Sequence, residues 1–158
     1  MPIVLESEMR STLRGLGRSM QRLNKEALLK TGEWWHSQIF PKHFLASAKT
    51  TYRYQRRKPS TKAIKTEQGR DPGLDLVQTG QSKRFMAVDP RFRATSTRGR
   101  VTMDAPAYWK GVEPGEPNKA DEATAINDAD RRRMGLAHSE HIAAAIKAYK
   151  EKAAAQKV

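Results

Sequence analysis

The sequence predicts an α+β fold in which a long N-terminal helix and a C-terminal helix pack on a small antiparallel β-sheet, with extended arms and loops. Three observations predict it: apolar residues recur at helical spacing after residue 18 and again near the C-terminus, and two short alternating segments lie between them. A chain of 158 residues suits one domain. We therefore assign residues 1–17 to an N-terminal arm, 18–150 to a single α+β domain and 151–158 to a flexible tail.

The first helix is expected over residues 19–40. The segment before it has only weak helical periodicity, which two glycines break, and this favours an arm. Pro41 is expected to end the helix, and Gly32 lies inside it at a cost of about 1 kcal/mol relative to Ala. Trp34 and Trp35 are adjacent and cannot face the same side, so we expect one ring to pack inward. One face of the helix carries Met20, Leu23, Ala27 and Trp34.

The segment that follows favours short elements joined by turns. Residues 42–48 are expected to add two helical turns, and the threonines and tyrosines of residues 50–54 favour an extended backbone. A short polar helix, capped by Ser60 or Thr61, is expected to end at Gly69.

The clearest strand signal comes from residues 91–96 and 100–104, which alternate polar with apolar side chains around a Thr-Arg-Gly turn. This pattern predicts a β-hairpin. Prolines and glycines then make an irregular loop of residues 105–117, around Tyr108 and Trp109.

Side-chain caps indicate where the last helices begin. Asn118 is expected to cap one helical turn, and Asn127 or Asp128 to cap a C-terminal helix. The apolar face of that helix continues to about Lys150, after which the tail is expected to fray.

Positive charge is concentrated in the middle of the chain, which carries a net charge of +13. Residues 42–100, which we call the basic module, contain 15 basic and 4 acidic residues, against 15 and 13 in the rest of the chain. Such a module favours a polyanion, either nucleic acid or an acidic protein surface. The alternative is a solvated basic surface with no ligand.

Several classes of chemistry have no residues to support them. The chain has no cysteine, which excludes disulfides, thiolate metal sites and cysteine nucleophiles. We expect neither a membrane span nor a secretory signal, because no segment approaches the apolar length of a span and the apolar tract at the start is short. The four histidines have no metal-site spacing, and no glycine-rich phosphate loop occurs. We therefore predict a protein that is not an enzyme and has no metal, cofactor or small-molecule site.

A series of short stretches in the C-terminal two thirds of the chain resembles a known family. The stretches are Tyr52-Arg53-Tyr54 with the basic run to Lys58, Asp75-Leu76-Val77-Gln78-Thr79-Gly80-Gln81-Ser82-Lys83-Arg84, Thr102-Met103-Asp104-Ala105-Pro106-Ala107-Tyr108 and Pro117-Asn118-Lys119-Ala120-Asp121-Glu122 before a C-terminal helix. Their order and spacing resemble minor structural proteins of tailed bacteriophages, the head-to-tail joining, tail-completion or neck proteins. Val112-Glu113-Pro114-Gly115 departs from the apolar pair and Gly-Thr that often follow the tyrosine in such proteins.

The resemblance implies a small α+β subunit that assembles as a homo-oligomeric ring at the phage neck or tail end. Such a tail-completion, tail-terminator or connector ring joins tail to head in the virion and is assembled in the cytoplasm of the bacterial host. The implied partners are other neck and tail proteins, with DNA passing through the channel as a further candidate. No membrane partner is implied.

Two functions remain open at this point. In the structural reading, aromatic and basic side chains form the contacts, because such residues dominate interface energetics. In the alternative, a nucleic-acid-binding protein without sequence specificity stacks its tyrosines on bases and sets its arginines on phosphates. We expect the basic run at residues 56–58 to be too polar for the core. The predicted contact residues are Trp34, Trp35, Tyr52, Tyr54, Arg56, Arg57, Lys58, Tyr108 and Trp109.

Overall fold

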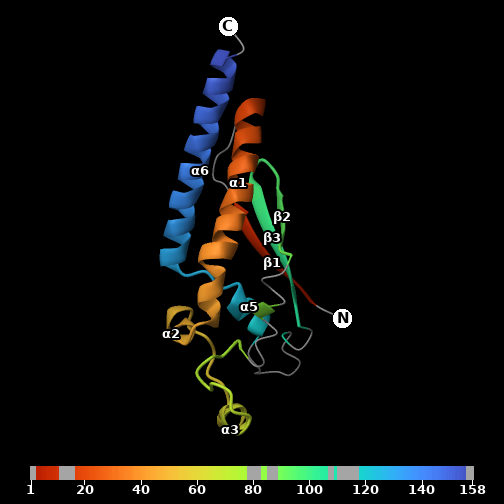
Figure 1. Cartoon of the computed structure of the whole chain (residues 1–158), viewed down its shortest axis with the longest axis vertical. Helices are drawn as coiled ribbons and strands as arrows, with labels where there is room; N and C mark the ends of the chain where they lie inside the picture. The colour runs from red at the N-terminus through yellow and green to blue at the C-terminus, as the bar shows by residue number, and fades with distance from the viewer. Residues whose placement is uncertain are drawn as a thin grey trace.

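The computed structural model of the chain describes residues 3–10, 17–77, 83–84, 89–106, 109 and 118–155, with only the backbone described at residues 3–5. The predicted α+β class is confirmed. Helix α1 (Arg18–Gln38) packs against a three-stranded antiparallel sheet and against helix α6 (Asp128–Ala155). In Figure 1 the molecule is elongated, with α1 between α6 and the sheet.

The sheet is built from a hairpin and the N-terminal segment. Strands β2 (Arg91–Ala94) and β3 (Arg98–Ala105) form the predicted hairpin, and β1 (Ile3–Arg10) pairs with the other side of β3 in the order β1-β3-β2. Both pairings are antiparallel.

The assignment of residues 1–17 to an arm is therefore wrong for residues 3–10. Ser7 and Met9 are buried, whereas Glu6, Glu8 and Arg10 are exposed. This is the two-residue period of a strand with one covered face. An eight-residue strand is stabilised mainly by the strand and helix that cover it, so the sequence of the segment alone did not distinguish it from an arm.

Helix α1 buries one face against the sheet. Leu28, Thr31 and Trp35 are buried on this face, and Gly32 allows a close approach to β3. A Cβ atom at Gly32 would lie 3.1 Å from Cγ2 of Val101. The propensity cost of this glycine is thus offset by closer packing of helix on strand.

The α-helix ends at Gln38, before Pro41, as expected. The chain continues in the 3₁₀ helix η1 (Phe40–Phe44), with Pro41 in its first turn, where no amide donor is needed.

The short elements after η1 differ in detail from the prediction. Helix α2 (Ala48–Thr51) includes the threonines that were expected to be extended, and Arg53 then adopts a left-handed conformation with φ 55°. Helix α3 (Pro59–Glu67) begins earlier than predicted, because Pro59 takes the first helical position. With η1 and α5 (Lys119–Ala123), these helices form the end of the molecule that lies at the bottom of Figure 1, which we call the lower lobe.

The predicted caps of the C-terminal helices are confirmed. The Asn118 side chain accepts hydrogen bonds from two backbone N–H groups of α5, and Oδ1 of Asn127 accepts from the Asp130 N–H at 2.7 Å. Helix α6 runs to Ala155, so residues 151–155 are helical and do not belong to a frayed tail. Among the helices of the described residues, none has the length and apolar character needed to cross a membrane.

The core lies between α1 and the sheet and extends into the lower lobe. Its fully buried side chains include Trp35, Ile39, Val101, Met103 and Trp109. Aromatic rings continue it downward, since Phe40 lies 5.6 Å from Trp35 and 5.3 Å from Phe44 between ring centroids.

Candidate functional site

The basic module does not form one surface. Its C-terminal part is the hairpin, where Arg91, Arg98 and Arg100 on the outer face of the sheet pair with carboxylates from β1 and β3. Arg100 Nη1 lies 3.2 Å from Glu6, and Arg91 Nη2 lies 2.9 Å from Asp104. The cations of residues 42–70 lie in the short helices of the lower lobe and in the segments that join them, and this lobe is therefore the candidate interaction site.

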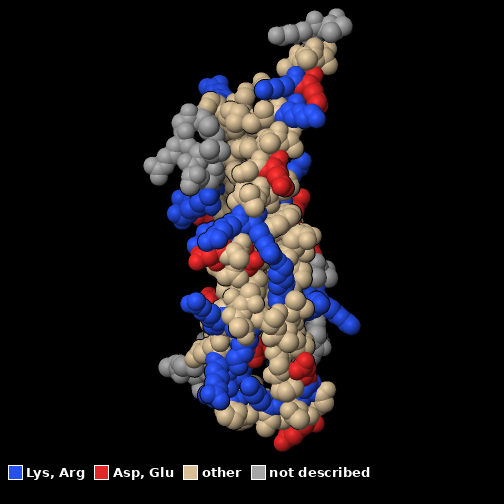
Figure 2. Space-filling model, turned by 90° about the vertical axis from the view of Figure 1, so that its left-hand side faces the viewer, with Lys and Arg blue, Asp and Glu red and all other residues tan. Residues whose placement is uncertain are grey.

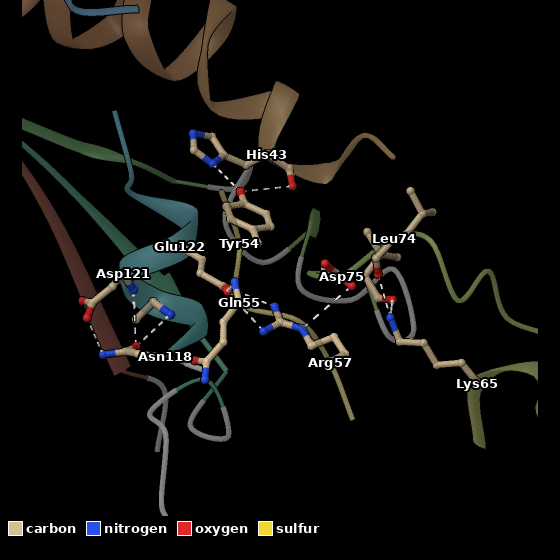
Figure 3. Close-up of polar contacts among 12 residues, drawn as sticks. His43, Tyr54, Gln55, Arg57, Lys65, Leu74, Asp75, Asn118, Asp121 and Glu122 are labelled. Atoms are coloured by element: carbon tan, nitrogen blue, oxygen red, sulfur yellow. Dashed lines mark hydrogen bonds and ion pairs between the residues drawn. The ribbon is translucent and has the colours of Figure 1, made fainter. Parts of the chain in front are cut away.

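One of these cations is buried beneath the lobe surface. Both terminal nitrogens of Arg57 donate to the Glu122 carboxylate, at 3.1 Å for Nη1 to Oε1, and Nε lies 3.9 Å from Oδ1 of Asp75 (Figure 3). The Glu122 carboxylate also accepts the Gln55 N–H at 2.9 Å. The expectation that the whole basic run lies outside the core is wrong for Arg57, because two carboxylates compensate its charge.

A second buried cation holds the turn after α3. The Lys65 ammonium donates to the carbonyl oxygens of Leu74 at 2.6 Å and Val77 at 3.1 Å (Figure 3). Burial lowers the pKa of Lys65, although the nearby Asp75 charge opposes this effect. Lys65 therefore holds the turn at residues 74–77, and this turn places Asp75 beside Arg57.

The tyrosines predicted to contact a partner are stacked inside the lobe. The His43 ring lies 3.8 Å from the Tyr52 ring between centroids. The Tyr54 hydroxyl lies 2.5 Å from Nδ1 of His43 (Figure 3). Burial raises the pKa of both tyrosines, with the Asp130 charge adding to the effect at Tyr52. Neither ring is available to stack on a nucleic-acid base.

The buried imidazole leads to a prediction on pH. Burial lowers the pKa of His43 to about 4, against an ordinary value of 6.5. Because the unfolded chain then binds a proton that the folded chain excludes, acid should destabilise the fold as the pH falls from 6.5 to about 4, and stability should be restored above 6.5. An NMR titration should show the His43 resonance unchanged down to pH 5. A midpoint near 6.5 would contradict the buried neutral state.

The predicted contact residues thus separate into two groups. Arg56 and Lys58 are exposed and Trp34 is half-buried, as contact residues can be, whereas Tyr108 lies outside the described residues. The others are interior side chains of this chain and cannot reach a partner unless the lobe opens: Trp35, Tyr52, Tyr54, Arg57 and Trp109.

Part of the exposed charge comes from a segment outside the basic module. Arg132 and Arg133 are exposed in the first turns of α6, and the charge of Arg133 acts on Tyr52, which shows that this turn lies beside the end of α2. Figure 2 shows Lys and Arg side chains from the level of the α6 start to the lower end of this face, with fewer Asp and Glu. The run of three arginines at 131–133 was the sequence signal for this part of the surface.

The carboxylates of the network were not singled out from the sequence. Glu122 and Asp75 lie 65 and 18 positions from Arg57, and only the fold brings them together. Both carboxylates lie in stretches quoted for the resemblance, which was the signal in the sequence that included them.

Metal-ligating side chains do not gather into a site among the described residues. No group of three His, Asp or Glu side chains that could hold a metal ion occurs in the part of the chain that the structure describes. Nε2 of His138, on α6, lies 3.0 Å from Oδ1 of Asn24, on α1. The lower lobe can present its exposed cations to a partner. Its acids Asp75 and Glu122 pair with Arg57 and thereby stabilise the fold.

Comparison of the chain with models of protein families, with curated proteins and with solved structures finds no match.

Proposed function

We propose that the chain is a structural virion protein of a tailed phage, a subunit of the neck ring that joins tail to head, and that it has no catalytic activity. In this role it is assembled in the host cytoplasm and remains in the virion. The lower lobe is the docking surface, and an acidic surface of a neighbouring neck or tail protein is its partner.

One observation carries the proposal. The stretches that resemble phage neck proteins are far apart in the sequence, yet three of them meet in the buried network. Arg57 comes from the first stretch, Asp75 from the second and Glu122 from the last, and they form one ion-paired cluster. The resemblance therefore falls on residues that together shape one lobe.

A nucleic-acid-binding function is the second candidate, favoured by the exposed cations. Because Tyr52 and Tyr54 are buried, the stacking that supports single-strand binding is absent from these residues. What remains is attraction to phosphate, which gives weak binding without sequence preference and with a steep dependence on salt.

The function is tested most directly in the phage that encodes the chain. Deletion of the gene should leave filled heads and separate tails in electron micrographs, and the protein should be present in purified virions. Joined, infectious particles without the protein would overturn the proposal.

The docking surface is tested by Arg56→Ser combined with Lys58→Ser. Both side chains are exposed, and serine is a favourable residue at the N-cap position that Lys58 occupies, so the fold should be retained. Head–tail joining should be weakened. Lys25→Ser combined with Lys30→Ser, two exposed positions of α1, is the matched control.

A gel-shift measurement with the wild-type chain separates the two functions. At about 150 mM salt, where exposed charges are screened beyond roughly 8 Å, we expect only weak DNA binding. Nanomolar, sequence-selective binding would favour the nucleic-acid function instead.

A further inference from the structure

The outer face of the sheet carries charged side chains in matched rows. The strand register places Glu8, Arg100 and Arg93 in one row across β1, β3 and β2. It places Glu6, Thr102 and Arg91 in the adjacent row. Each row begins with an acid on one edge strand and ends with an arginine on the other.

The arginine at the end of the first row lacks a counter-charge. No ion pair joins Arg93 to an acid among the described residues, and its register partner is Arg100, which has the same sign. Like charges opposite one another destabilise a strand pair. A carboxylate on the open side of β2 would compensate this position.

Both edges of the sheet are open within the described residues. Strand β1 and strand β2 are the outer strands of the order β1-β3-β2, and no third described strand pairs with either. A cleft of about 680 Å³ separates the end of β1, at Met9, from α6, whose Met134 and His138 line the opposite wall. Unpaired backbone groups at such edges form a template for a further strand.

We propose that a second copy of this chain pairs its β1 edge with the β2 edge of the first, placing its Glu6 and Glu8 beside Arg91 and Arg93. Strands β1 and β2 both run antiparallel to β3, so they run parallel to each other and the new pair continues the sheet as a parallel pair. The matched rows then place each acid level with an arginine of the neighbouring copy.

The charges select this head-to-tail contact over two-fold pairing. Two β2 edges would oppose their arginines, and two β1 edges would oppose their glutamates, which like-charge repulsion disfavours. A contact between unlike edges repeats from copy to copy and closes as a ring when the rotation allows. Ring closure is the part of this inference that rests on the proposed function.

Arg93→Glu tests the pairing of the β1 and β2 edges, because it should weaken assembly without destabilising the monomer. Within one chain the new carboxylate faces Arg100, so the thermal midpoint of the monomer should not fall. Between chains it faces Glu8, so the dissociation constant should rise about tenfold. Sedimentation velocity measures the assembly, and Lys25→Glu makes the same charge change at an exposed position of α1.

A mixing experiment distinguishes unlike edges from like edges. Glu6→Lys blocks the β1 edge and Arg93→Glu blocks the β2 edge, so each variant alone should be largely monomeric at a protein concentration between the wild-type and the variant dissociation constants. Their mixture should form a one-to-one dimer, because each supplies the edge that the other has lost. A variant that dimerises alone, or a mixture that stays monomeric while the wild-type chain assembles, overturns the inference.

Two further outcomes count against the pairing. A wild-type chain that remains monomeric at the highest concentration reached overturns it. Assembly that Arg93→Glu and Glu6→Lys affect no more than Lys25→Glu also overturns it, while leaving the ring of the proposed function in place. The gene-deletion phenotype tests that function independently of the edges.

Discussion

Replacement of Trp35 by alanine is expected to destabilise the protein by about 3–5 kcal/mol, the range for removing a large aromatic side chain from a packed core. The Trp35 side chain is 0% exposed, and its ring packs against Phe40 where α1 meets η1. Its removal would leave a cavity among side chains that cannot all move into it. Unfolding in urea, followed by circular dichroism, measures the loss.

Trp34→Ala is the matched control, because the same residue type is removed one position earlier on the same helix. Trp34 is half-buried and lies at the border of the core, so its replacement should cost clearly less. Equal losses for the two variants would show that α1 does not present Trp35 to the core as described.

Replacement of Glu122 by alanine should have an effect of similar size, about 3–5 kcal/mol, because it leaves the buried Arg57 without its closest counter-charge. Glu122 accepts from Arg57 and from the Gln55 N–H, and it joins α5 to the segment after α2. The 3.9 Å contact with Asp75 is too long to replace these bonds. Thermal unfolding monitors the change.

Two further variants identify the cause of the Glu122 effect. Asp121→Ala removes an exposed carboxylate on the same helix, which accepts only from the Asn118 side chain at 2.8 Å among described contacts, and should cost far less. Arg57→Ala combined with Glu122→Ala should cost less than the two single changes added together, since neither charge is then left alone. Strict additivity would contradict the ion pair.

Local signals in the sequence determined much of the secondary structure. The β-hairpin, the caps at Asn118 and Asn127 and the end of α1 before Pro41 depend on residues within a few positions of each other. Hydrogen bonds and steric limits of that range act in any context, so the pattern alone predicts them. The helical period predicted that the two adjacent tryptophans would differ in burial, but it placed Trp34 on the apolar face, whereas the structure buries Trp35 and leaves Trp34 half-buried, because the sheet covers the neighbouring face of α1.

The tertiary structure alone decided what the basic and aromatic residues do. The sequence predicts that Arg57 belongs to an exposed cationic run. In the structure Arg57 is buried, because the fold brings it to Glu122, 65 positions away. Tyr52 and Tyr54 were predicted as contact residues, but the fold places the Tyr52 ring against the His43 ring of η1 and the Tyr54 hydroxyl on the same imidazole. Strand β1 lacked a recognisable pattern because its stability comes from β3, about 95 positions later along the chain. In each case the residue's environment is determined by interactions between segments that are distant in the sequence. The composition and periodicity of one segment carry no information about which segment it will contact.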